Sequence, residues 1–203
     1  MKLYCIRHAA TSANYSGQMV NGYESCDIAD FNKPDDWEDK IGKYIPDEAR
    51  KFIISSTVRR CLSTSKMLFD RYPDEISTEL LEFDCSALGN RKFWEITKAE
   101  FDSLVFLPWT TMEKRAYNIL NDMCNVIRFD SNAESAVVIS HGMILRYLYH
   151  FINFNQDISA YDVINSVGFT FSNLDLMIID TTLLTTEVYH YQQPLEHKWD
   201  SNE

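Results

Sequence analysis

The sequence predicts an α/β protein of three layers, α/β/α, in which helices cover both faces of a mostly parallel central sheet. Two observations favour this class. Short apolar runs, typical of strands buried on both faces, alternate with segments of helical period. In addition, 203 residues with 45% hydrophobic and 24% charged side chains have the composition of an ordinary globular domain. We therefore expect a single domain over residues 1–203.

Three apolar runs are expected to form the parallel strands. They cover residues 3–6, 52–54 and 136–139, and each ends abruptly at polar residues. Residues 168–191 are rich in β-branched and aromatic side chains, and we expect them to form antiparallel strands that close the sheet.

Helical periodicity fills the intervals between these runs. Apolar residues recur at helical spacing from Val58 to Tyr72, where Pro73 provides a stop. The same spacing predicts a helix over about 110–127 and another from 143 to about 154. The first and last of these helices each follow a predicted strand directly, as the α/β class requires.

Two segments have no clear period, residues 16–48 and residues 84–109. Connections of this length often cover a functional site. We predict that both are irregular insertions in the single domain.

Charge and cysteine content limit the partners and the compartment. Thirty acidic and 19 basic residues give a net charge of −11, so we expect neither nucleic acid nor an anionic membrane surface as a partner. No apolar stretch approaches the roughly 20 residues of a membrane span, and the N-terminus has no signal-peptide pattern. The five cysteines are odd in number, widely spaced and never Cys-x-x-Cys, which is typical of reduced thiols. These features indicate a cytoplasmic protein.

Polar residues that could bind or react with a ligand follow the predicted strands. Ligands of open α/β sheets bind beyond the carboxyl ends of the strands, so residues that follow the apolar runs are candidates. They are Arg7, His8, Ser55, Ser56, Arg60, Ser140, His141 and Gly142. Taken alone, each histidine or arginine is more often a capping or solvated residue than a catalyst. Their joint placement in an acidic protein predicts a local anion site.

The residue types suit a phosphate group. Guanidinium groups bind phosphate oxygens in a bidentate manner, and imidazole can act as a nucleophile or proton carrier. The sequence has no His-Glu-x-x-His, no calcium loop and no Gly-rich loop ending in Lys-Ser/Thr. We therefore expect chemistry without a metal ion or other cofactor.

Four motifs resemble those of the histidine phosphatase superfamily, the phosphoglycerate mutase-like proteins (branch 1). The segment at 6–14, IRHAATSAN, is similar to the family's Arg-His-Gly motif with its following Thr and Asn. The segment at 55–65, SSTVRRCLSTS, resembles Ser-Ser-Pro-Leu-x-Arg-Ala-x-Gln-Thr-Ala, and Leu80-Leu81-Glu82 falls where the family carries its acid. The segment at 140–146, SHGMILR, resembles Ser-His-Gly-Gly-x-Ile-Arg. The resemblance spans residues 1 to about 150 and implies a phosphoglycerate mutase-like fold.

The resemblance also implies roles for individual residues. His8 would attack phosphorus and become a phosphohistidine, and His141 would help to hold the phosphoryl oxygens. Glu82 would protonate the leaving oxygen and then accept a proton from water. The remaining phosphate-binding groups would be Arg7, Asn14, Arg60 and Gly142, with Arg60 and not Arg59 as the matching arginine. This set implies a metal-independent phosphomonoesterase that acts on a small phosphorylated metabolite.

Several alternatives stay open on the sequence alone. A mutase-like phosphotransferase would use the same residues, and a non-catalytic module could bind phosphate without turnover. Asp84 lies close enough to Glu82 to compete as the proton donor. We expect Ser55 and Ser56 to cap the following helix in preference to touching phosphate.

Overall fold

The computed structural model describes residues 1–18, 26–88, 91–92, 95–104, 109–131, 133–154 and 171–192. Within them a six-stranded sheet has the order β3-β2-β4-β1-β5-β6. Its strands are β1 (Lys2–Arg7), β2 (Ile53–Ser56), β3 (Glu75–Ser77), β4 (Ser135–Ser140), β5 (Leu176–Asp180) and β6 (Thr185–Tyr189). Strands β1 to β4 are parallel, whereas β5 pairs antiparallel with β1 and β6 antiparallel with β5. The mostly parallel sheet is thereby confirmed.

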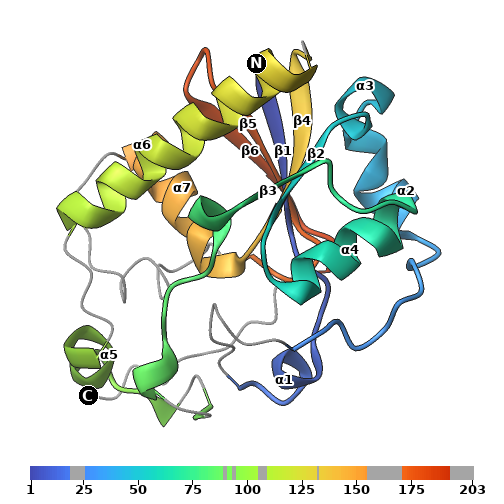
Figure 1. Ribbon diagram of the computed structural model, residues 1–203. Helices are drawn as coiled ribbons and strands as arrows, with labels where there is room; N and C mark the ends of the chain where they lie inside the picture. The colour runs from blue at the N-terminus through green and yellow to red at the C-terminus, as the bar shows by residue number, and fades with distance from the viewer. Residues whose placement is uncertain are drawn as a thin grey trace.

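Helices lie on both faces of the sheet (Figure 1). On one face are α6 (Trp109–Val126) and α7 (Gly142–Phe154), and on the other are α2 (Trp37–Lys40), α3 (Asp47–Arg50) and α4 (Arg59–Phe69). The predicted three-layer α/β/α arrangement is confirmed.

Alternate residues of the central strands supply two separate cores. In β4, Ala136 and Val138 pack in the core that contains α6 and α7, while Val137 and Ile139 pack in the core that contains α4. Successive side chains of a strand point to opposite faces, so a strand covered on both sides must be apolar throughout. This is why the apolar runs were informative.

The predicted helices are present with small differences at their ends. Helix α6 spans 109–126 against a prediction of about 110–127, and α7 spans 142–154 against 143–154. Helix α4 ends at Phe69 because Asp70 adopts a left-handed conformation with φ 55°, three residues before the proline that was expected to stop it. Strand β3 was not predicted, because it is a three-residue edge strand with exposed side chains.

The two insertions are less irregular than predicted. The first contains α2, the 3₁₀ turn η1 (Gly42–Tyr44) and the first two residues of α3, and the second contains η3 (Ser86–Leu88) and α5 (Lys98–Leu104). Residues 19–25, 89–90, 93–94 and 105–108 of these insertions lie outside the described part of the chain.

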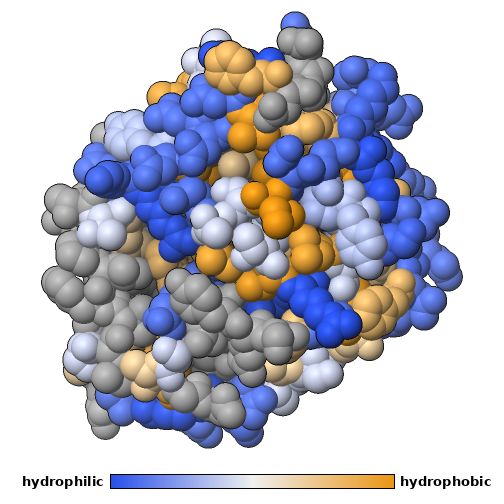
Figure 2. Space-filling view, in the orientation of Figure 1, coloured by the Kyte–Doolittle hydropathy of each residue, from blue (hydrophilic) through white to orange (hydrophobic). Residues whose placement is uncertain are grey.

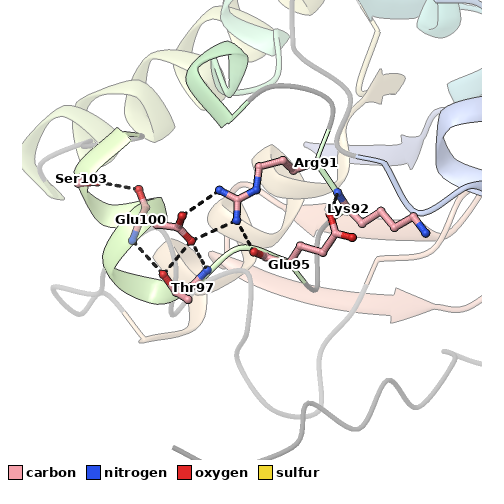
Figure 3. Close-up of polar contacts among 6 residues, drawn as sticks. All are labelled: Arg91, Lys92, Glu95, Thr97, Glu100 and Ser103. Atoms are coloured by element: carbon pink, nitrogen blue, oxygen red, sulfur yellow. Dashed lines mark hydrogen bonds and ion pairs between the residues drawn. The ribbon is translucent and has the colours of Figure 1, made fainter.

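A capping box explains α5. Thr97 Oγ1 accepts from the Glu100 amide at 3.3 Å, and Glu100 Oε2 accepts from the Thr97 amide at 3.0 Å. Arg91 Nη1 binds Glu100 Oε1 at 2.9 Å, so one carboxylate joins the helix to the residues before it (Figure 3). The Thr-x-x-Glu spacing is a helix-start signal that an argument from apolar periodicity overlooks.

One face of the molecule has an apolar area near β3. Figure 2 shows apolar side chains gathered near the middle of the face that β3 presents in Figure 1, with hydrophilic residues on both sides. A shallow hollow there is lined by residues of β3 and α6, at the edge strand and not at the strand ends. All five cysteines are free thiols. In the described ranges no helix is long and apolar enough to cross a membrane.

Candidate active site

His8 immediately follows β1 and is buried, with 4% of its surface exposed. Its amide donates to the carbonyl of Ser140 at 2.9 Å, which continues the pairing of β1 with β4 beyond the last strand residue. Its ring Nδ1 lies 2.8 Å from the carbonyl oxygen of Ala9. A carbonyl can only accept, so Nδ1 carries the proton and Nε2 carries the lone pair. The ring is therefore held in the tautomer that exposes Nε2 as a nucleophile.

Two arginines provide positive charge beside this ring. Burial lowers the pKa of His8 well below its ordinary 6.5, and the guanidinium groups of Arg60 and Arg7 lower it further. Arg60 itself is 1% exposed, on the first turn of α4. Arg7 Nη1 donates to the carbonyl of Phe171, while its buried Nε has no hydrogen-bond partner among the described residues. A buried guanidinium nitrogen in this state fits a site built for an oxyanion.

His141 follows β4 and joins the same group. Its ring lies 5.2 Å from that of His8, centroid to centroid, at an angle of 66°. Nδ1 lies 3.3 Å from Arg60 Nη2 and Nε2 lies 3.0 Å from Ser56 Oγ. Arg60 can only donate, so Nδ1 of His141 is the acceptor and Nε2 bears the proton. Burial above all, and then the charges of His8 and Arg60, lower the pKa of His141 well below 6.5.

The expectation that Ser55 and Ser56 cap the next helix is wrong. The N-cap of α4 is Val58, which makes no side-chain cap bond. Ser55 Oγ instead donates to the carbonyl of Ser56, and Ser56 Oγ binds His141. The sequence identified both serines and His141, but it did not predict the contact between Ser56 and His141.

Glu82 follows the 3₁₀ turn η2 (Thr78–Leu80) and reaches the start of α7. Its Oε2 accepts from the Met143 amide at 3.1 Å, and its Oε1 from the Phe83 amide at 3.1 Å. Burial raises the pKa of this carboxyl above its ordinary 4.5, against the opposing effect of the two amides. A raised pKa favours the protonated form that a general acid needs near neutral pH.

Asp84 differs from Glu82 in each of these respects. It is exposed, and its Oδ1 accepts from the Ser86 amide at 3.0 Å. The Ser86 side chain and amide lower the pKa of Asp84 below its ordinary 3.8. This carboxylate is thus ionised at neutral pH and unsuited to donate a proton. The geometry favours Glu82 over Asp84.

Asn14 is linked to His8 through Asn173, a residue that the sequence did not indicate. Asn14 Oδ1 accepts from the Thr11 amide at 3.1 Å and from Asn173 Nδ2 at 3.3 Å. Asn173 Nδ2 also donates to the carbonyl of His8 at 2.8 Å. Because the oxygen of the Asn14 amide is used by two donors, its Nδ2 is the group that can donate to a ligand.

Gly142 leaves room for the Arg7 side chain. A Cβ at this position would lie 3.1 Å from Arg7 Nε and 3.2 Å from Arg7 Cζ. The absence of a side chain therefore makes room for the Arg7 guanidinium, which packs against the first residue of α7. Gly142 shapes the site through Arg7, and its part in phosphate binding stays a prediction.

The geometry of these residues defines a class of site. Two guanidinium groups, two neutral imidazoles and one carboxyl group of raised pKa meet at the carboxyl ends of parallel strands. Such a set can bind a phosphoryl group, accept it on nitrogen and transfer a proton. No cluster of three or more His, Cys, Asp or Glu side chains suited to a metal ion occurs in the described ranges.

The chain belongs to branch 1 of the histidine phosphatase superfamily, whose model matches residues 3–182. It is accordingly an enzyme of the phosphatase class. The comparison with curated proteins gives no match.

Solved structures of the same fold cover nearly the whole chain. Phosphoserine phosphatase from Entamoeba histolytica, in complex with 3-phosphoglyceric acid, has 16% identity and a TM-score of 0.69 over 95% of this chain and 98% of its own. The α-ribazole phosphatase of Shigella flexneri has 15% identity and a TM-score of 0.60 over 94% and 95%. Mycobacterial glucosyl-3-phosphoglycerate phosphatase has 15% identity and a TM-score of 0.59 over 92% and 96%. At these identities the likeness establishes the fold alone, which is the phosphoglycerate mutase-like α/β fold.

Proposed function

We propose that this chain is a metal-independent phosphomonoesterase that transfers the phosphoryl group of a small organic phosphate to His8 and then to water. The state of His8 is the observation that carries the proposal. The ring is buried and neutral, its Nδ1 proton is held by the Ala9 carbonyl, and two arginines flank it. A binding module would need the arginines but not a neutral imidazole fixed in one tautomer.

In the first step, the lone pair of His8 Nε2 forms a bond to phosphorus. The bond from phosphorus to the ester oxygen breaks, and that oxygen leaves as an alcohol after it takes the proton of Glu82. Arg7, Arg60 and the Asn14 amide bind the other phosphoryl oxygens and offset their charge in the transition state. The products of this step are phosphohistidine, the free alcohol and a Glu82 carboxylate.

In the second step, water attacks phosphorus from the side that the alcohol has left. The Glu82 carboxylate accepts a proton from this water, the bond from phosphorus to Nε2 breaks, and its electron pair returns to His8. Inorganic phosphate then leaves and both residues regain their first state. One carboxyl group thus acts as acid and base in turn.

His141 supports this chemistry through Arg60. With one ring nitrogen accepting from Arg60 and the other donating to Ser56, the ring fixes the direction of the guanidinium. It also lies against the His8 ring, within reach of a phosphoryl group bound there. We assign it to orientation of the phosphoryl site.

The substrate class is a small phosphorylated metabolite. The structural neighbours are named as phosphatases for phosphoserine, α-ribazole and glucosyl-3-phosphoglycerate, which supports this class. The net charge of −11 disfavours a nucleic acid substrate. We further propose a cytoplasmic location, in keeping with five free thiols.

The test is a phosphatase assay with EDTA present, on p-nitrophenyl phosphate and a panel of metabolite phosphates. Turnover should persist in EDTA, and His8→Ala should abolish it. Quenched wild-type enzyme should carry acid-labile, alkali-stable phosphate that His8→Ala lacks. Arg60→Ala should lose about 100-fold in kcat. Arg59→Ala is the matched control, because this exposed side chain pairs with Asp27 and should leave the rate unchanged.

Two results would overturn the proposal in favour of its alternatives. Phosphoryl transfer to an added alcohol without release of inorganic phosphate would identify a mutase-like phosphotransferase. Phosphate binding with no turnover of any ester would identify a phosphate-binding module.

A further inference from the structure

The segment that carries Glu82 has no regular structure of its own. After η2 (Thr78–Leu80) the chain runs extended through Leu81, outside the sheet. Backbone carbonyls at the end of a short helix need partners from elsewhere. Three consecutive carbonyls here, those of residues 79, 80 and 81, accept from the side chains of Arg115 and Ser140.

Arg115 lies on α6 and contacts this segment. Its Nη2 donates to the Glu79 carbonyl at 3.0 Å and to the Leu81 carbonyl, and its Nε lies 3.3 Å from the Glu79 carbonyl. Its guanidinium also lies over the ring of Phe83, 5.3 Å from the centroid. One side chain therefore contacts the residue before Glu82 and the residue after it.

Ser140 supports the same segment from β4. Its hydroxyl donates to the Leu80 carbonyl at 2.9 Å. Ser140 is the last residue of β4 and directly precedes His141. The same contacts that hold the Glu82 segment thus relate it to the strand end that carries a histidine of the site.

We propose that Arg115 is a positioning residue for Glu82, holding this carboxyl where it can donate its proton to the leaving oxygen. The planar guanidinium of Arg115 donates to the carbonyls of Glu79 and Leu81 at the same time. The compact ammonium group of a lysine cannot reproduce this pair of contacts. The inference rests on the proposed function, because it assigns Glu82 as the acid. It predicts that loss of Arg115 impairs proton donation and leaves phosphate binding and attack by His8 in place.

Substrate pairs isolate proton donation. The ratio kcat/KM covers only the steps up to departure of the alcohol, so it reports on the acid. An alkyl ester such as glycerol phosphate needs a proton on its leaving oxygen, whereas p-nitrophenyl phosphate has a leaving group that departs without one. Glu82→Gln should lower kcat/KM for the alkyl ester by about 100-fold or more and for the aryl ester much less.

Arg115→Met should follow the same pattern to a smaller degree. We expect a loss of about 10-fold on the alkyl ester and less than about 3-fold on the aryl ester, since a small misplacement of a catalytic group is costly. In the Glu82→Gln background, Arg115→Met should cause no further loss. Arg115→Lys, which keeps the charge and one donor group, should fall between wild type and Arg115→Met and serves if Arg115→Met does not fold.

Arg50→Met is the matched control. Arg50 also donates to two backbone carbonyls, those of Ile45 and Gly42, but on the opposite face of the sheet. It should lower stability and leave the alkyl-to-aryl ratio unchanged. Equal losses on both esters in the Arg115 variants, or losses that add fully to those of Glu82→Gln, would overturn the proposal.

A second measurement does not depend on turnover. Burial raises the pKa of Glu82, so a displaced segment should let this pKa fall toward its ordinary value in Arg115→Lys, as followed by carbon NMR of the labelled carboxyl. An unchanged pKa would overturn the positioning role even if the protein proved to have no phosphatase activity. Inactive wild-type enzyme with a shifted Glu82 pKa would instead refute the proposed function alone.

Discussion

Gly142→Ala tests how closely the phosphate site is built around Arg7. The new Cβ would lie 3.1, 3.2 and 3.4 Å from Arg7 Nε, Cζ and Cδ. Ordinary carbon contacts are about 3.5–4.0 Å, so the guanidinium must retreat by about 0.5 Å. The Arg7 side chain is half-buried and its Nη1 donates to the Phe171 carbonyl, so the retreat moves the guanidinium within the site.

The size of the effect follows from the bond that is weakened. A hydrogen bond to a charged group contributes about 1.5–3 kcal/mol, and losing about half of one corresponds to phosphate binding about 3-fold to 12-fold weaker. The fold itself should lose little, since alanine is the better helix former at the first residue of α7. We expect a change of less than about 1 kcal/mol in the free energy of unfolding.

The assay pairs competitive inhibition by inorganic phosphate with urea unfolding. Gly42→Ala is the control, because its Cβ would meet the Glu38 carboxylate at 2.5 Å, far along the chain from the site residues. It should lower stability and leave the inhibition constant unchanged. Unchanged phosphate inhibition in Gly142→Ala would refute the reasoning, and so would a large loss of stability in this variant.

Three further outcomes are expected. The pKa of His8 is lowered and that of Glu82 is raised. We therefore expect kcat/KM to be greatest on the acid side of neutrality and to fall with rising pH as Glu82 ionises. Glu82→Gln should remove this fall. The depressed pKa values of His8 and His141 mean that the unfolded chain binds more protons, so stability measured in urea should decrease as pH falls below about 6.5. In His8→Asn this slope should shrink by up to about 1.4 kcal/mol per pH unit. Thr97→Ala should weaken α5 by about 1 kcal/mol, seen as faster amide exchange confined to that helix.

The sequence predicted the parts of the fold that obey a simple burial rule. Strands β1, β2 and β4 are covered on both faces, so each contains a run of consecutive apolar residues. Strand β3 has one paired neighbour and exposed side chains, so it left no apolar run to find. Helix α5 depends on a capping box and not on an apolar stripe, and periodicity therefore missed it.

The same limit applies to the site. Arg7, His8 and His141 were found because they follow parallel strands, whose carboxyl ends share one edge of the sheet. Asn173 reaches that edge in the opposite direction, because β5 runs antiparallel to β1 and begins where β1 ends. The residues just before an antiparallel neighbour thus deserve the same scrutiny as those after a parallel strand. Arg115 acts from the middle of a helix, and no local signal marks it.

The site divides positive charge, nucleophile and proton among different residue types. Both histidines are neutral because burial and the arginines oppose their protonation, so Arg7 and Arg60 carry the positive charge of the site. Arginine keeps its charge across the pH range in which a histidine would lose it.

His141 Nδ1 accepts a hydrogen bond from Arg60, so protonation of Nδ1 would break the contact that orients this guanidinium. In the proposed mechanism, phosphate affinity is therefore separate from the titration of the histidines. Only Glu82, whose pKa is raised by burial and whose Oε2 accepts from an amide in the first turn of α7, would change its protonation state during a catalytic cycle. Because this mechanism binds the anion through fixed charges and moves its proton through one carboxyl group, we expect the backbone contacts that hold Glu82 to affect turnover as the arginines do.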